Sequence, residues 1–117
     1  PGQVTMSLRL RLDKPWQPLT AETAQRLPGQ LGVYQVADAK GTVLFIGQAG
    51  ARAPFGLRSE LQRELAERGT GHQFRVEVNQ QYRTRWFELL MVHKADHGAL
   101  PPDNEKNPPP LGRLSPN

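Results

Sequence analysis

Hydrophobic and polar residues alternate in two segments of the chain, as they do in strands that have one buried face. The alternation is strict in SLRLRL, residues 7–12, and recurs in HQFRVEVN, residues 72–79. Two other β-rich runs, residues 31–37 and 42–47, are separated by the turn-forming sequence DAKG. Short loops of this composition typically join the strands of a β-hairpin. We therefore predict a first strand, a hairpin, and a later strand that pairs with the hairpin in a small sheet.

Three segments have the pattern of helices. Leucines recur at helical spacing between residues 56 and 69, where Gly69 is a suitable end. Residues 82–97 form a second long pattern, which Gly98 and a Pro-Pro pair terminate. Thr20 is a candidate cap for a short helix over residues 21–27. This order of elements predicts an α+β fold, a small antiparallel or mixed β-sheet with flanking helices.

The two ends of the chain differ in composition from the middle. Residues 1–5, which precede Met6, are typical of a vector-derived remnant. Residues 101–117 contain too many prolines for a helix or a central strand, so we expect most of this stretch to be an extended tail. A chain of 117 residues is long enough for one core. We predict a single domain over residues 6–104 and a Pro-rich tail over residues 105–117.

Charge and composition narrow the possible partners. The chain has 15 Lys and Arg against 11 Asp and Glu, which gives a net charge of +4 and favours a polyanionic partner. The absence of Cys excludes disulfides and thiolate metal sites. No apolar run reaches the roughly 20 residues that span a membrane. We expect a cytoplasmic protein that has no membrane partner.

Four features appear in one order along the chain: GVY at residues 32–34, FIG at residues 45–47, Arg58 in the helix that follows, and Glu88 alone in the apolar run WFELLMVH. A buried carboxylate costs several kcal/mol unless it is paired or bound to a cation, so Glu88 needs solvent or a partner. With these features, residues 29–104 resemble the GIY-YIG nuclease family.

The resemblance implies a metal-dependent endonuclease that hydrolyses phosphodiester bonds in nucleic acid, with DNA favoured. It assigns Glu88 as the ligand of Mg²⁺ or Mn²⁺, Tyr34 as the proton acceptor, and Arg58 as the cation that stabilises the phosphate. The family's Asn near the end of the domain corresponds best to Asn104. A single carboxylate is sufficient for Mg²⁺, which keeps several of its waters. A Tyr with an ordinary pKa near 10 needs a nearby cation to act as a base.

Two departures from the family favour other functions. Phe45 replaces the Tyr of the second motif, and Gln48 replaces the Lys that follows it in many members. One alternative is a degenerate module of the same fold that binds nucleic acid without cutting it; another is a protein-interaction domain. The candidates for nucleic-acid binding are cations interleaved with aromatic residues, although solvated helix faces have the same pattern. They are Arg52, Arg63, Arg83 and Arg85.

The candidate site residues also have structural explanations. Tyr34 is an ordinary strand aromatic in that case, and Arg58 pairs with a neighbour on the helix surface. Glu88 has Arg85 three residues earlier, a spacing that permits an ion pair on a helix.

Two further pairs of residues have alternative explanations. Gly32 and Gly47 are more readily explained by close approach of the backbone than by chemistry. His93 and His97, at i,i+4 spacing, would need a third ligand to bind Zn²⁺.

Overall fold

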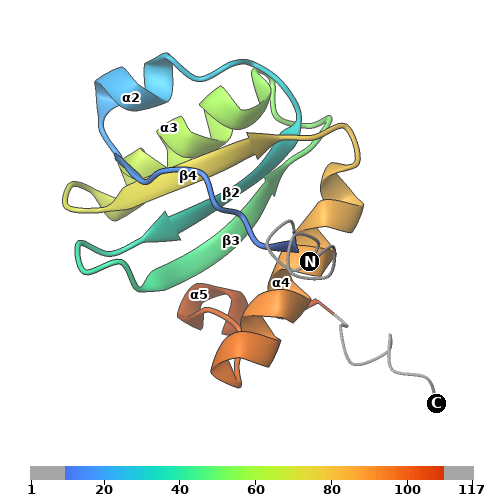
Figure 1. Cartoon of the computed structure of the whole chain (residues 1–117). Helices are drawn as coiled ribbons and strands as arrows, with labels where there is room; N and C mark the ends of the chain where they lie inside the picture. The colour runs from blue at the N-terminus through green and yellow to red at the C-terminus, as the bar shows by residue number, and fades with distance from the viewer. Residues whose placement is uncertain (1–9, 110–117) are drawn as a thin grey trace.

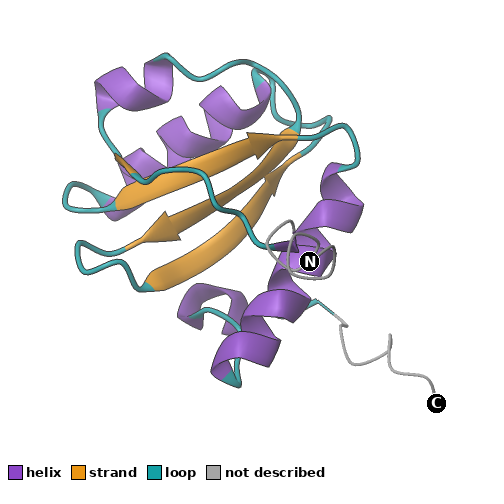
Figure 2. Ribbon diagram, in the orientation of Figure 1, coloured by secondary structure: helices purple, strands orange, loops and turns teal. Residues whose placement is uncertain are grey.

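The computed structural model describes residues 10–109. Within this range it contains a four-stranded sheet and four helices (Figures 1 and 2). In chain order the elements are β1 (Gln17–Pro18), α2 (Ala21–Gln25), β2 (Gly32–Ala37), β3 (Val43–Ala49), α3 (Gly56–Arg68), β4 (Gln73–Val78), α4 (Tyr82–His97) and α5 (Pro102–Glu105). The predicted hairpin, the later strand and the three predicted helices are all present.

The sheet has the strand order β1-β4-β2-β3, and each neighbouring pair is antiparallel. The fold is therefore α+β with an antiparallel sheet, which resolves the antiparallel or mixed alternative. β2 is central, so Tyr34 lies opposite Gly47 on β3 and Val76 on β4. β3 forms one edge of the sheet.

Helices cover both faces of the sheet, with α2 and α3 on one face and α4 on the other (Figure 1). The core accordingly has two parts. The part under α2 and α3 includes Tyr34, Val36, Leu57, Leu61 and Phe74. The part under α4 includes Leu12, Val33, Ile46, Leu89 and Leu90. Because β2 lies between them, every one of its residues is buried.

Thr20 caps α2 as predicted, since its hydroxyl accepts from the Thr23 backbone N–H and the Thr23 hydroxyl accepts from the Thr20 N–H. α2 ends at Gln25, two residues before the predicted end at residue 27. α3 ends before Gly69, which has a positive φ of 81° that favours glycine. α4 has the predicted bounds and ends before Gly98 in the left-handed conformation.

The first predicted strand is wrong where it falls within the described residues. Residues 7–9 lie outside them, and residues 10–12 are not in a strand. Leu12 is buried under α4, and Arg11 binds Asp96 of α4. In the described part of this segment, Arg11 and Leu12 thus contact α4, and the short strand β1 follows instead.

The prediction that most of residues 101–117 form an extended tail is wrong for α5. Pro102 occupies the first turn of this helix, where its missing N–H and fixed φ are tolerated. The Glu105 carboxylate accepts a hydrogen bond from the Leu100 N–H, which holds the entry to the helix. Residues 1–5 and 110–117 lie outside the described residues.

Within residues 10–109, no helix has both the length and the apolar character needed to cross a membrane. A cytoplasmic location remains a prediction.

Candidate functional site

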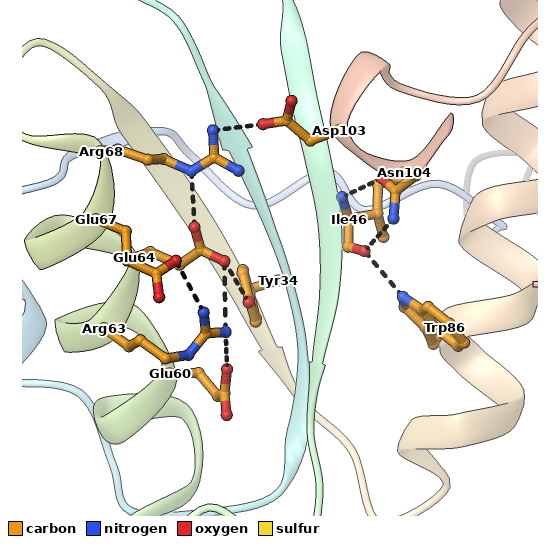
Figure 3. Close-up of polar contacts among 10 residues, drawn as sticks. All are labelled: Tyr34, Ile46, Glu60, Arg63, Glu64, Glu67, Arg68, Trp86, Asp103 and Asn104. Atoms are coloured by element: carbon orange, nitrogen blue, oxygen red, sulfur yellow. Dashed lines mark hydrogen bonds and ion pairs between the residues drawn. The ribbon is translucent and has the colours of Figure 1, made fainter. Parts of the chain in front are cut away.

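Tyr34, the predicted proton acceptor, lies in the interior between β2 and α3. Its side chain is 1% exposed, and its hydroxyl donates a hydrogen bond of 2.7 Å to Glu64 Oε2 (Figure 3). The ring lies over Gly47, its partner on β3. A Cβ at Gly47 would lie 2.3 Å from Tyr34 Cζ, so no larger residue fits there without a shift of the ring. Gly47 therefore makes room for Tyr34, as the structural explanation of the glycines anticipated.

Gly32 has a similar role at the start of β2. A Cβ there would lie 2.2 Å from the Glu77 carbonyl oxygen on β4 and 3.0 Å from Leu57 of α3. The glycines of both motifs thus permit close approach within the sheet and between the sheet and α3.

Glu64 is the centre of a buried ionic cluster that links β2, α3 and α5. Its carboxylate is 3% exposed and accepts from Arg68 Nε at 2.7 Å, while Arg63 Nη2 lies 3.7 Å away. Arg68 also donates to Asp103 of α5 at 2.7 Å (Figure 3). A buried carboxylate is tolerated when it is paired and hydrogen-bonded; Tyr34 and Arg68 donate hydrogen bonds to Glu64, and Arg63 adds a second positive charge nearby.

The cluster determines the protonation of Tyr34. Burial raises the pKa of the Tyr34 phenol well above its ordinary value of 10, and the Glu64 charge and hydrogen bond raise it further. At neutral pH the phenol is therefore a protonated donor. In this arrangement it cannot accept a proton from a water molecule.

Arg58 lies in the first turn of α3, as predicted, but its side chain turns toward the α2–β2 connection. Its Nε donates to the Leu27 carbonyl at 2.9 Å, and its guanidinium carbon lies 5.7 Å from the centre of the Phe55 ring. In the part of the chain that the structure describes, Arg58 has no carboxylate partner and does not contact the Tyr34 hydroxyl.

Glu88 lies on α4, on the opposite face of the sheet from the Tyr34 ring. Its carboxylate accepts from Arg85 Nη1, and its side chain is 40% exposed. Arg85 also makes two bonds to Glu77, of 2.9 and 3.1 Å. Burial opposes ionisation of Glu77, but the hydrogen bonds from Arg85 and Asn79, together with the nearby positive charges, lower the pKa of Glu77. Both the ion pair and partial exposure therefore stabilise the Glu88 charge.

The guanidinium of Arg85 lies between the carboxylates of Glu77 and Glu88 and bonds to both. A divalent cation coordinated by both carboxylates would have to occupy this same position. Among residues 10–109 there is no group of three or more His, Cys, Asp and Glu residues placed to hold a metal ion. The rings of His93 and His97 stack with their centres 4.2 Å apart. The residues around Glu88 as they stand do not fit a Mg²⁺ site, because the Arg85 guanidinium is bonded to both carboxylates and occupies the space between them.

Asn104 is held at the edge of the sheet rather than beside Tyr34. Its Oδ1 accepts from the Ile46 N–H at 2.8 Å, and its Nδ2 donates to the Ile46 carbonyl at 3.0 Å. Trp86 Nε1 donates to the same carbonyl at 2.9 Å (Figure 3). Asn104 thus satisfies backbone groups of the edge strand β3, which would otherwise lack partners in the sheet.

The four predicted nucleic-acid-binding arginines divide into two pairs. Arg63 and Arg85 are engaged with carboxylates. Arg52 and Arg83 are exposed and, within residues 10–109, have no carboxylate partner. Arg26, at the end of α2, is likewise exposed and has no carboxylate partner within residues 10–109. It was not identified from the sequence, because it lies outside the motifs.

Sequence reasoning also missed the role of Glu64. A signal for it exists in the sequence. Residues 57, 61, 64, 65 and 68 fall on one face of an α-helix, so Glu64 and Arg68 lie on the apolar stripe of α3. A carboxylate on such a stripe requires a donor from the sheet below, and Tyr34 is that donor.

Comparison with known proteins gives one result. The family model of a domain of unknown function, DUF7508, matches residues 10–96. The match covers the sheet and nearly all of α4, and it ends before α5. No curated protein and no solved structure matches the chain.

Proposed function

The chain belongs to the DUF7508 family, and we propose that it is a GIY-YIG-like module that binds nucleic acid without cutting it. The observation that carries this proposal is a set of arginines without acidic partners, one of which, Arg58, lies against an exposed aromatic ring. We call this set the loop-end surface, and it consists of Arg26, Arg52, Phe55, Arg58 and Arg83.

The loop-end surface is formed where several connections meet at one end of the sheet. β3 and β4 both end there, and α3 and α4 both begin there (Figure 1). Arg58 joins the α2–β2 connection to α3 through its bond to Leu27. A Cβ at Gly50, in the β3–α3 loop, would lie 3.0 Å from the Tyr82 ring, so this loop packs against the start of α4.

The charges of this surface are available to an anion. In the described part of the chain, none of its four arginines has a carboxylate within ion-pair distance. The neighbouring carboxylates Glu60 and Glu77 are bound by Arg63 and Arg85. Uncompensated arginines attract a phosphate backbone and release its counterions.

Phe55 adds a feature suited to unpaired bases. Its side chain is 58% exposed, which is unusual for a large apolar residue, and Arg58 lies against its ring. Bases stack on exposed aromatic rings regardless of sequence, while neighbouring cations hold the phosphates. The loop-end surface offers both kinds of contact.

The contacts of the motif residues support binding without hydrolysis. Tyr34 is buried and protonated, and Glu88 is paired with Arg85 on the other face of the sheet. The second candidate is the metal-dependent endonuclease that the motifs imply, with DNA favoured as substrate and Mg²⁺ or Mn²⁺ as cofactor. It requires Tyr34, Arg58 and Glu88 to act on one phosphate, and therefore a different arrangement of these side chains.

Binding is tested with labelled single- and double-stranded DNA and RNA by fluorescence anisotropy at two salt concentrations. If four phosphates are neutralised on a single strand, affinity falls by about 50-fold for a fourfold increase in salt. The double variant Arg52→Gln/Arg83→Gln removes two of the contacts, so both the affinity and the salt dependence decrease. The matched control, Lys40→Gln/Lys94→Gln, loses the same charge at exposed positions away from this surface and keeps the affinity.

Two results would contradict the proposed binding function. If the wild-type protein bound none of the four nucleic acids in a salt-dependent way, a protein-interaction domain would be the better conclusion. If the control variant lost as much affinity as the double variant, binding would reflect net charge rather than this surface.

Cleavage is tested with the same substrates in Mg²⁺, Mn²⁺ or EDTA, using the wild-type protein and Glu88→Ala. We expect intact substrate under all conditions. Cleavage that depends on the metal and is absent in Glu88→Ala would instead establish the endonuclease, with Glu88 at the metal.

A further inference from the structure

A cavity of about 200 Å³ lies on the α4 side of the sheet, away from the loop-end surface. Its polar lining comes from three parts of the chain: Arg11 before β1, Gln35 and Arg75 from the sheet, and His93, Asp96 and His97 from α4. Ligand pockets for drug-sized molecules usually measure about 300–1,000 Å³. This cavity is smaller, and therefore fits a small group.

Arg75 is the dominant charge in the cavity. It lies opposite Gln35 in the sheet, and its Nε donates to Gln35 Oε1 at 2.8 Å. The guanidinium carbon lies 4.2 Å from the centre of the Trp16 ring, and Nη1 contacts the Lys14 carbonyl at 3.4 Å. The side chain is thereby fixed by contacts to neutral groups alone.

The charge of Arg75 is not balanced by an ion pair. No carboxylate of residues 10–109 lies within 4.0 Å of its guanidinium, although Asp13 acts on it from farther away. Burial lowers the pKa of Arg75, but a guanidinium remains charged at neutral pH. A partly buried cation without a counter-ion is unfavourable, and an anion in the cavity would compensate it.

The other groups in the cavity complete a site for an anion. Arg11 forms two bonds with Asp96, of 2.8 and 3.0 Å, so these two charges balance one another. Burial, followed by the effect of His97, lowers the pKa of His93, which is therefore neutral at pH 7. His93 forms no hydrogen bond with the described chain and is able to donate one.

We propose that this cavity binds a small oxyanion, either inorganic phosphate or the phosphate group of a small monoester, with Arg75 as its principal contact. Arginine presents a planar fork of donors that matches phosphate oxygens. The apolar part of the lining, which includes Leu12, Leu89 and Val92, is able to contact the organic part of a monoester.

The test is a titration of the chain with inorganic phosphate at neutral pH and constant ionic strength, followed by backbone and arginine side-chain NMR. We expect saturable shifts at Arg75 and along the second half of α4. Loss of one charged hydrogen bond weakens binding by about 10-fold or more, so Arg75→Gln is expected to show that loss. Arg75→Lys keeps the positive charge but loses the planar fork of donors, so its phosphate affinity should lie between those of the wild-type chain and Arg75→Gln. This variant also keeps the test informative if Arg75→Gln does not fold.

Lys40→Gln is the control, because Lys40 is exposed in the β2–β3 turn and does not line this cavity. It should bind phosphate as the wild-type chain does. Shifts that never saturate, or an Arg75→Gln chain that binds phosphate as tightly as the wild-type chain, would overturn the proposal; if Arg75→Gln does not fold, unchanged affinity in Arg75→Lys would do the same. A parallel titration with phenyl phosphate distinguishes the two ligands: tighter binding identifies a monoester, and equal or weaker binding identifies inorganic phosphate.

Discussion

Tyr34→Phe removes a single oxygen atom, the one that donates to Glu64. A hydrogen bond to a charged group contributes about 1.5–3 kcal/mol to stability. Removing a charged partner altogether would cost more, about 3–5 kcal/mol, because a buried charge would be left unpaired. Here Glu64 keeps Arg68 at 2.7 Å and Arg63 at 3.7 Å. We therefore expect the free energy of unfolding to fall by about 1.5–3 kcal/mol.

Urea denaturation followed by tryptophan fluorescence measures this loss. Chains of this size have slopes of about 1–3 kcal/mol per M urea, so the midpoint should fall by about 0.5–3 M with an unchanged slope. Trp86 packs against the part of the core under α4, and both parts share β2, so its fluorescence follows the cooperative unfolding of the domain. An unchanged slope indicates that the variant still unfolds from a native state of similar compactness.

The control is the same chemical change at the other tyrosine. Tyr82 packs near Gly50, and its hydroxyl makes no hydrogen bond with residues 10–109. Tyr82→Phe should change stability by less than about 0.5 kcal/mol. If Tyr34→Phe cost no more than Tyr82→Phe, the bond to Glu64 would not be a stabilising interaction.

Three further predictions concern the same sheet. In a Tyr82→Phe chain, Tyr34 is the remaining phenol; its raised pKa adds stability that is complete below pH 10 and lost at higher pH, so phenolate absorbance should appear only as the fold is lost. Gly47→Ala should destabilise the fold by about 1–3 kcal/mol in urea denaturation, because its Cβ overlaps the Tyr34 ring. Asn104→Ala should cost about 1–3 kcal/mol and speed hydrogen exchange at the Ile46 amide, which loses its acceptor.

The hairpin, the later strand and the two long helices were predictable because local signals agreed with the tertiary environment. The DAKG turn, the leucine spacing and the terminal glycines each indicated the element that formed. The first strand was not predictable, since alternation in residues 7–12 does not distinguish pairing with a strand from packing against a helix. α5 was missed because prolines weaken helices in general, whereas one in the first turn does not.

The sequence predicted which elements carry the candidate site residues better than it predicted where their side chains lie in space. Tyr34, Arg58 and Glu88 lie on the expected elements, but the spacing along the chain does not specify which face of the sheet each helix covers. α4 packs on the face opposite the Tyr34 ring, and the distance between Tyr34 and Glu88 follows from that choice. The loop-end surface was only partly predicted, because Arg26 is distant in sequence and joins it through a loop.

The motif residues indicate how the sheet and α3 pack together, but they do not by themselves indicate catalysis. Gly32 and Gly47 are required by close contacts, and Tyr34 fills the space that Gly47 leaves, so these residues are explained by packing alone. Hydrolysis would require a phenol able to release its proton, and that depends on the residue facing it. In this chain the facing residue is Glu64, a carboxylate that favours the protonated phenol. Glu64 on the apolar stripe of α3 is therefore more informative about catalysis than the two tripeptides.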